Sequence, residues 1–174
     1  MIISLEELKV IFPNEEEQSL LFKIKSIESV IRSYTKNNFQ DRRIRFKAAI
    51  VDGKVYGGSP YILKGDTVQI SQSINNGVYT VRNASETELI LTDEYLFNSP
   101  HNVITKVIYP IDVKNIALEM LKWELNYSEK VAAGISSESI SRYSVSYNSS
   151  GNTVNGYPQS IMQKLKPYMR AKFS

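Results

Sequence analysis

The side chains that could carry out acid–base, metal or nucleophilic chemistry are few and far apart in this sequence. The only histidine is His101, in FNSPHNVI, and there is no cysteine. A hydrolase would need a serine elbow and an acid to orient the imidazole, and a metal would need about three further ligands. Asp93 and Glu94 occupy adjacent positions of an expected strand, so they point to opposite faces. We therefore expect a protein that is not an enzyme and that uses no cofactor or metal.

Positively charged side chains form two candidate contact surfaces. In RIRFKAAI, Arg43, Arg45 and Lys47 alternate with apolar residues, so a strand would place all three cations on one face. No acid follows Glu138, so the C-terminal part carries +5 and the preceding part −2. Its cations are Arg142, Lys164, Lys166, Arg170 and Lys172. The strand cations could contact a nucleic-acid backbone or could be a solvated strand face. The C-terminal cations could contact a polyanion or an acidic protein surface, or could be a solvated helix end.

The elements that position these residues begin with two expected helices in residues 4–36. Ser4 can cap a short first helix, which Pro13 interrupts. Asn14 then precedes three glutamates, residues 15–17, and acidic side chains favour a helix N-terminus. The next apolar residues are spaced four, three, four and three apart, which indicates one stripe on a long second helix. They are Leu20, Ile24, Ile27, Ile31 and Tyr34.

Residues 111–131 are expected to form a third helix, with Asp112 as its N-cap. Only a narrow stripe is polar, and the remaining circumference is apolar and includes Trp123. The stripe consists of Asn115, Glu119, Lys122 and Asn126. A helix this broadly apolar is usually buried against more than one neighbour, and a small helical domain often gains stability by oligomerising. A final short helix is expected after Tyr157-Pro158.

Residues 39–110 change to strand-like alternation with turn signals between the runs. They predict a small antiparallel barrel or sandwich of about five strands. The strongest signal for a tight hairpin turn is Asn76-Gly77, in SINNGVYTV. The fold class predicted is therefore α+β. A small helical bundle, residues 1–38 and 111–174, is interrupted by an inserted antiparallel β-barrel or sandwich domain, residues 39–110.

A serine-rich stretch, GISSESISRYSVSYNSSG, lies between the last two expected helices. Serine hydroxyls compete for backbone hydrogen bonds, so this segment has little reason to be helical. Tyr143, Val145 and Tyr147 recur at every second position, which favours an extended strand. A lone two-stranded excursion is only marginally stable, so we expect the segment to pair with a neighbouring chain, or else to be a loop within its own chain.

Three motifs in this order resemble the C-terminal half of bacteriophage head–tail connector proteins, also called head-completion or adaptor proteins. They are ALEMLKWEL, GISSESISRYSVSY and YPQSIMQKLKPYMR, and the N-terminal ISLEELKVIF is similar to the first helices of that family. The resemblance covers about residues 2–36 and 111–172. GDTVQISQSINNGVYTV is similar to β modules inserted in other phage neck proteins.

The resemblance implies a structural virion protein that assembles as a ring, commonly of twelve subunits, below the portal. Such a ring joins the DNA-filled head to the next neck, stopper or tail protein, and DNA passes through it without sequence-specific binding. The implied location is the neck of the virion, after synthesis in the bacterial host cytoplasm, with no membrane involved.

Two sets of residues are expected to serve this role. The partner-binding set is Trp123, Glu138, Ile140, Arg142, Tyr143, Val145, Tyr147 and Tyr157. The set expected to contact the portal or line the DNA channel is Lys164, Lys166, Arg170 and Lys172. The alternative function is a nucleic-acid-binding β-barrel module that uses Arg43, Arg45 and Lys47.

Overall fold

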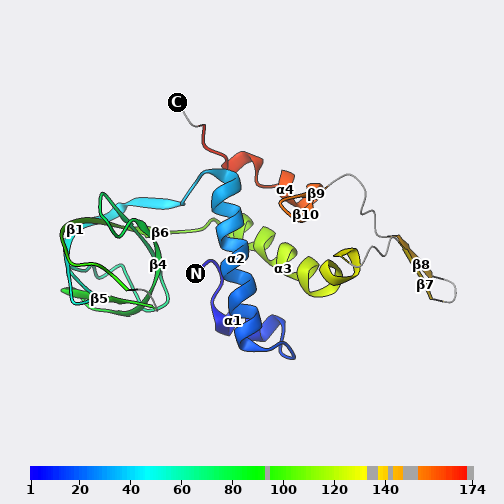
Figure 1. Cartoon of the computed structure of the whole chain (residues 1–174), viewed down its shortest axis with the longest axis horizontal. Coiled ribbons are helices and arrows are strands. Elements are labelled where there is room, and N and C mark those ends of the chain that lie inside the picture. Colours follow the sequence, from blue (N-terminus) through cyan, green and yellow to red (C-terminus); the bar gives the residue numbers. More distant parts are fainter. Residues whose placement is uncertain (93–94, 133–136, 141–142, 147–152, 172–174) are drawn as a thin grey trace.

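The computed structural model describes residues 1–92, 95–132, 137–140, 143–146 and 153–171, and side-chain surroundings for residues 1–92, 95–126 and 153–171. A closed six-stranded barrel lies beside a helical body, and a two-stranded hairpin lies beyond the far end of the helices (Figure 1). The predicted α+β class with a barrel module is confirmed. In the part of the chain that is described, no helix is long and apolar enough to cross a membrane.

The first two helices form much as predicted. Helix α1, Leu5–Ile11, begins with a capping box: Ser4 Oγ accepts the Glu7 N–H at 3.2 Å, and Glu7 Oε2 accepts the Ser4 N–H at 2.9 Å. Helix α2, Glu17–Thr35, has Glu16 as its N-cap, so the helix starts two residues later than an N-cap at Asn14 would place it. The four aliphatic residues of its predicted stripe are fully buried, and Tyr34 is half-buried.

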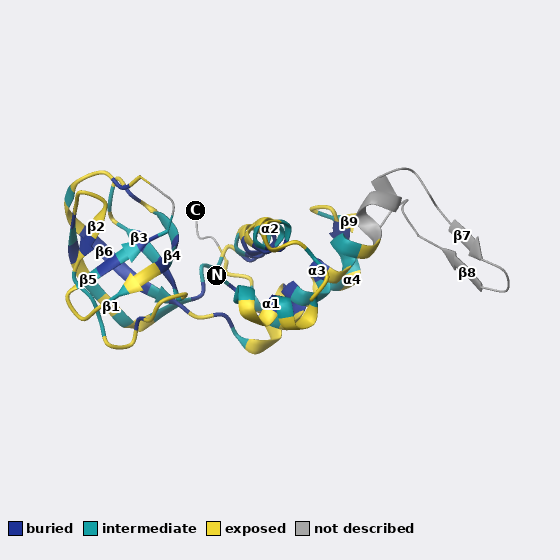
Figure 2. Ribbon diagram, turned by 90° about the horizontal axis from the view of Figure 1, so that it is seen from below, coloured by how far each residue is buried: buried dark blue, intermediate teal, exposed yellow. Residues whose placement is uncertain are grey.

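Helix α3, Ile111–Ala132, packs against α2 and completes the core of the helical body (Figure 2). Asp112 lies inside its first turn, so the predicted N-cap at this residue is wrong. The predicted polar stripe is confirmed, because Asn115, Lys122 and Asn126 are exposed and Glu119 is half-buried. The side chains that α3 buries are Val113, Ile116, Ala117, Met120 and Leu121.

The short C-terminal helix predicted after Tyr157-Pro158 forms, and it ends at Gln163, before Pro167. Helix α4, Gln159–Gln163, is followed by a single 3₁₀ turn, Lys166–Tyr168. Pro167 lies within that turn, where a missing backbone N–H does little harm, but it prevents a continuous helix. Met162 and Leu165 enter the core of the helical body. The basic residues of this segment therefore do not share one helix.

The barrel encloses its own hydrophobic core, separate from that of the helices. Its six strands are β1 Gln40–Val51, β2 Lys54–Tyr56, β3 Thr67–Ser71, β4 Gly77–Ala84, β5 Glu88–Leu91 and β6 Ser99–Val107. All pairings are antiparallel, in the closed order β1-β2-β5-β4-β3-β6. Inward-pointing aliphatic side chains such as Ile50, Ile70 and Ile104 are fully buried inside the barrel.

The tight hairpin turn occurs at Asp52-Gly53 and not at Asn76-Gly77, which corrects the prediction. Asp52 and Gly53 have φ values of 49° and 75° and join β1 to β2 directly after the Val51–Lys54 pair. Strands β3 and β4 are instead joined by residues 72–76, and Gly77 is the first residue of β4. A Cβ at Gly77 would lie 2.9 Å from the Tyr79 ring, so its glycine is explained by packing.

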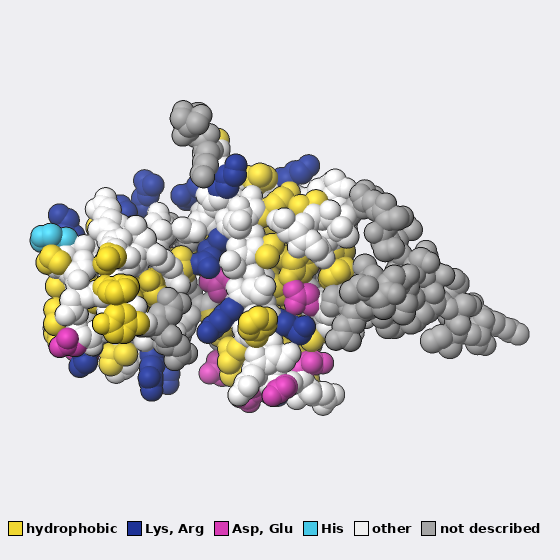
Figure 3. Space-filling model, viewed as in Figure 1, with side chains coloured by type: hydrophobic (Ala, Val, Ile, Leu, Met, Phe, Trp, Pro, Cys, Tyr) yellow, Lys and Arg dark blue, Asp and Glu magenta, His cyan; other side chains and the backbone are white. Residues whose placement is uncertain are grey.

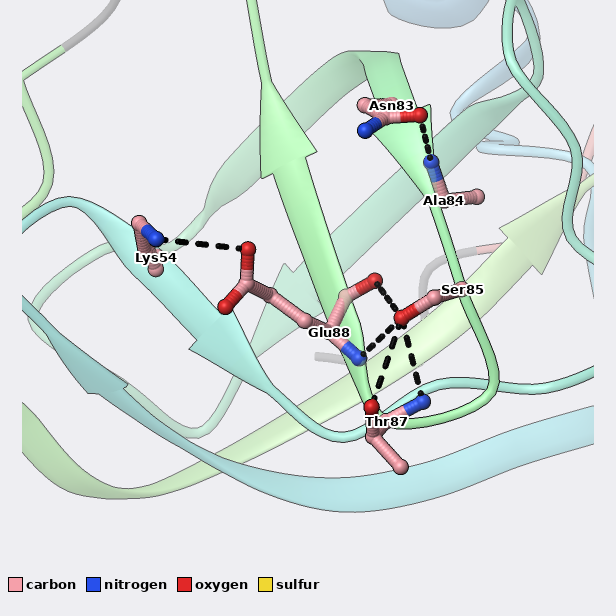
Figure 4. A network of polar contacts seen from close by, with 6 residues as sticks. All are labelled: Lys54, Asn83, Ala84, Ser85, Thr87 and Glu88. Carbon is pink, nitrogen blue, oxygen red and sulfur yellow. Dashed lines mark hydrogen bonds and ion pairs between the residues drawn. The ribbon is translucent and has the colours of Figure 1, made fainter.

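The connection between β4 and β5 is fixed by one serine side chain (Figure 4). Ser85 Oγ accepts the backbone N–H groups of Thr87 and Glu88 at 3.3 and 2.9 Å, and it donates to the Glu88 carbonyl at 3.1 Å. The Glu88 carboxylate also lies 3.5 Å from Lys54 Nζ of β2. A serine side chain that satisfies successive backbone groups is a normal means of closing a turn.

Both connections between the helical body and the barrel run side by side. Gln40 pairs with Val107 at the edge of the barrel, and the Ile108 N–H donates to the Phe39 carbonyl at 2.9 Å. The Phe39 and Tyr109 rings then meet with centroids 5.0 Å apart. These residues belong to the core of the helical body, so the two connections are anchored there.

Candidate assembly surfaces

The serine-rich stretch contains a β-hairpin. Strand β7, Ser137–Ile140, pairs antiparallel with β8, Tyr143–Ser146, and the register places Glu138 opposite Val145 and Ile140 opposite Tyr143. The predicted strand at Tyr143 and Val145 is confirmed, and its partner strand comes from the same chain. Of the remaining residues predicted here, Arg142 and Tyr147 lie outside the described residues.

This hairpin has free edges. Among the strands that are described, β7 and β8 pair only with each other. The outer edge of each therefore carries backbone N–H and C=O groups that no described strand satisfies, and such edges readily pair with another chain. The hairpin lies past the end of α3, away from the helical body and from the barrel (Figure 1).

Trp123 and Tyr157, two residues of the predicted partner-binding set, lie together in the helical body. Their ring centroids are 5.9 Å apart, and Trp123 is half-buried. Tyr157 is only 5% exposed and donates its O–H to the Glu124 carboxylate. Burial and then this carboxylate raise the pKa of the Tyr157 hydroxyl. Because the Tyr157 side chain is buried within its own chain, it is not accessible to a partner subunit, contrary to the prediction.

The C-terminal cations are dispersed, contrary to the prediction of one basic helix. Lys164 Nζ lies 2.6 Å from Glu119 Oε2 of α3, whereas Lys166 and Arg170 are exposed. The backbone N–H of Arg170 donates to the Thr35 carbonyl at 2.9 Å, which places this segment against the C-terminal end of α2. Lys172 lies outside the described residues. Lys166 and Arg170 thus remain as available cations at one end of the helical body.

The opposite end of the helical body is acidic. Glu6 and Glu7 occupy the first turn of α1, and glutamates 15–17 surround the start of α2. Acidic side chains gather at this end in Figure 3, and basic side chains gather near the C-terminus. The helical body is therefore electrically polarised along its length, which favours one orientation toward charged partners.

An apolar groove between α1 and α3 was not foreseen from the sequence. It measures about 310 Å³ and is lined by Ile3, Val10, Ile11, Ile111 and Leu118 together with polar side chains at its rim. Val10 is 83% exposed and Ile111 is 68% exposed. Clustered exposed aliphatic side chains often mark contact sites. The only sequence signal was a pair of apolar residues, Val10 and Ile11, at the end of a helix too short to bury both.

The basic strand of the barrel lies on the outer face as predicted, because Arg43, Arg45 and Lys47 are all exposed. Arg43 is held by Asp41, whose Oδ1 accepts Nε and whose Oδ2 accepts Nη2, both at 2.9 Å. These hydrogen bonds lower the pKa of the Asp41 carboxyl, so this neighbour stays anionic. Its charge offsets one of the three cations and weakens the case for a nucleic-acid surface.

His101 is exposed on β6. Within the described ranges, no group of three or more His, Asp or Glu side chains is placed to hold a metal ion. No acid is hydrogen-bonded to the His101 ring among these residues. Among the described residues, His101 therefore has no neighbouring side chains placed for acid–base or metal chemistry.

Comparison with known proteins does not identify a family: no protein-family model matches this chain, and no curated protein matches it. The resemblance to head–tail connectors therefore stays a prediction from the motifs quoted above.

Proposed function

We propose that this protein is a head–tail connector of a tailed bacteriophage, a structural adaptor that forms a ring between the portal and the next neck or tail component. The observation that carries the proposal is the β7–β8 hairpin, which lies away from the helical body and has two outer edges that no described strand pairs with. The order of motifs along the chain supports the same function, because it resembles that family across both helical segments.

A projecting hairpin suits assembly for a physical reason. Two strands alone are marginally stable in water, and a third strand or a covering surface from another subunit would stabilise them. The hairpin and the apolar groove between α1 and α3 are different surfaces of the described chain. A contact between the hairpin and a different surface of the next subunit is heterologous, and repeated contacts of that kind close into a ring when the rotation permits.

The apolar groove between α1 and α3 is the surface that we assign to the neighbouring copy. A heterologous contact needs a second surface on the same chain, and in the described helical body this groove combines concave shape with exposed aliphatic side chains. Burying Val10 and Ile111 would contribute roughly 1.5–3 kcal/mol each if complete.

Ring formation would also align the charged ends of the subunits. Lys166 and Arg170 would form a basic rim, and the glutamates of α1 and α2 an acidic one. A basic rim can contact an acidic portal surface or DNA in transit. Because clustered cations bind DNA strongly at low salt, a small number of them suits a channel through which DNA must move.

The test is assembly with purified portal, observed by negative-stain microscopy and sedimentation velocity. Replacing residues 137–146 with a Gly-Ser segment of equal length is expected to abolish rings on the portal while leaving the thermal midpoint within a few degrees. The matched control is the triple variant Arg43→Gln, Arg45→Gln and Lys47→Gln, which is expected to assemble normally. Normal rings from the hairpin variant would contradict the proposal.

A duplex DNA titration against salt addresses the alternative barrel function. The triple variant is expected to bind DNA about as the unmodified protein does. Submicromolar affinity that vanishes in the triple variant, in a protein that forms no ring on the portal, would instead establish a nucleic-acid-binding module.

A further inference from the structure

A polar cleft separates α2 from the outer face of the barrel. It measures about 310 Å³. From the helix it is lined by Lys25, Glu28 and Arg32, and from the barrel by Thr67, Val78, Tyr79, Thr80 and Thr92. Charged side chains occupy the space between helices and barrel in Figure 3. The cleft is distinct from the hairpin, the apolar groove and the basic C-terminal end.

The barrel contributes hydroxyl groups to this cleft. Thr67 of β3 lies opposite Thr80 of β4, and Thr92 donates its hydroxyl to the Thr80 carbonyl at 3.1 Å. Thr67 Oγ1 already accepts a hydrogen bond from the Met1 nitrogen, whereas within the described ranges the Thr80 hydroxyl makes no hydrogen bond. Oriented hydroxyls are suitable donors to an oxyanion.

The adjoining row of the same sheet face holds unsatisfied polar atoms. Gln69 follows Thr67 by two residues on β3 and is paired with Thr105 of β6. Thr105 is fully buried. Gln69 Oε1 and Thr105 Oγ1 are buried without a hydrogen-bond partner among the described residues. Buried polar atoms of this kind usually bind water. Gln69 pairs with Val78, which lines the cleft, so these polar atoms lie beside the cleft and not in its lining.

The helix contributes two cations, Lys25 and Arg32, and one anion, Glu28, to the cleft, so its net charge there is +1. Both oxygens of Glu28 are occupied, since Oε2 accepts the Ile2 N–H at 3.1 Å and Oε1 accepts the Tyr109 hydroxyl at 2.8 Å. In the described structure, the side chains of Arg32 and Lys25 make no hydrogen bond or ion pair, although Arg32 is half-buried. They lie seven residues apart and therefore on one side of the helix. An arginine that is half-buried and has no partner among the described residues gains from binding an anion.

We propose that this cleft binds a small phosphate-type oxyanion, with Arg32 as the principal ligand. The planar guanidinium can donate two parallel hydrogen bonds to one phosphate group, and Lys25 supplies a second cation. The Thr80 hydroxyl donates from the opposite wall. Because the ligand contacts α2 and the barrel together, it bridges the two parts of the molecule and stabilises their packing. The inference concerns the isolated chain and does not depend on the adaptor function.

Pyrophosphate is the probe, titrated into the full chain by calorimetry in chloride buffer, with the thermal midpoint followed in parallel. Saturable binding and a rise in the midpoint are expected. Arg32→Gln is expected to weaken the affinity by about tenfold or more, and Lys25→Gln by about threefold. Arg42→Gln, which removes an equal charge from an exposed position outside the cleft, is expected to leave the affinity within about twofold.

Thr80→Val tests the contribution of the barrel side of the cleft. It provides an independent test if Arg32→Gln fails to fold. This variant keeps the shape of the side chain and is expected to weaken pyrophosphate binding by about threefold. No saturable binding at millimolar pyrophosphate, or equal losses in Arg32→Gln and Arg42→Gln, would overturn the proposal.

A competition arm identifies the source of the phosphate. If short duplex DNA displaces pyrophosphate and its own binding is lost in Arg32→Gln, the cleft takes a backbone phosphate of DNA. If duplex DNA leaves pyrophosphate bound, the cleft takes a small free anion. Either result supports the oxyanion site.

Discussion

Glu28 and Tyr109 form a buried polar pair where the helical body meets the barrel. Tyr109 is 6% exposed and donates its hydroxyl to Glu28 Oε1 at 2.8 Å. Burial, followed by the negative charge of Glu28, raises the pKa of the Tyr109 hydroxyl far above its ordinary value of 10.0. Tyr109 therefore stays protonated in the folded protein under conditions in which an unfolded tyrosine ionises.

This difference predicts a loss of stability at alkaline pH. Above about pH 10 the folded state binds more protons than the unfolded state, so the free energy of unfolding falls by up to about 1.4 kcal/mol per pH unit for this residue. The stabilisation is complete below that pH and disappears as the pH rises toward the folded pKa. Urea unfolding from about pH 9 to about pH 11.5 measures the slope.

Tyr109→Phe separates the contribution of this residue. At neutral pH the variant is expected to lose about 1–3 kcal/mol, because one oxygen of Glu28 loses its donor in a buried site. Its alkaline slope should be shallower, and a residual slope should remain because the pKa of Tyr157 is also raised. The control Tyr61→Phe, at a residue 68% exposed, should change neither quantity. An unchanged slope in Tyr109→Phe would refute the assignment.

Helix α1 depends on the two reciprocal hydrogen bonds of its capping box. The Glu7 carboxylate accepts the Ser4 N–H, and chiefly this hydrogen bond lowers the pKa of Glu7. A helix of seven residues is too short to persist without its cap and the packing of Leu8. Ile11 and Val10, which line the apolar groove, are held by the same helix.

Ser4→Ala is therefore expected to reduce the free energy of unfolding by about 1 kcal/mol. The backbone N–H groups of Glu7 and Leu8 should exchange faster with solvent as α1 frays. The comparison variant is Ser26→Ala, an exposed serine inside α2, where alanine is a slightly better helix former. Equal stability of the two variants would mean that the capping box contributes nothing measurable in solution.

Periodicity in the sequence was sufficient to predict the elements that depend on local chemistry. The stripe of α2, the cap at Ser4 and the outward face of Arg45 all follow from side-chain spacing. The turn at Asn76-Gly77 did not form because tertiary contacts compete with it. The side-chain amide of Asn75 exchanges two hydrogen bonds of 2.8 Å with the backbone of Phe97, which requires a longer loop.

At the scale of the whole molecule, sequence patterns could not locate the two concave surfaces. The polar cleft joins Arg32 of α2 to Thr80 of the barrel, residues that no local spacing relates. The apolar groove likewise joins Val10 to Ile111. By contrast, the serine-rich segment was recognised because an alternating pattern is visible within a few residues. Features assembled from distant segments need the folded chain.

Hydrogen exchange tests the assembly of the β7–β8 hairpin. In the isolated protein, the N–H groups on its outer edges have no described strand to pair with, so residues 137–140 and 143–146 should exchange rapidly. In rings on the portal, these groups are expected to exchange at least about tenfold more slowly. The core of α3 serves as the internal reference and should be protected in both states. Strong protection of the hairpin in the isolated protein would contradict assembly-dependent pairing.

The adjacent connections at Phe39 and Ile108 have a consequence for the history of the gene. Because the barrel leaves the helical body and returns to it at neighbouring backbone positions, its removal would leave two ends close enough to be rejoined by a simple turn. A helical protein could thus have acquired the whole barrel by a single in-frame insertion, with its own fold left intact.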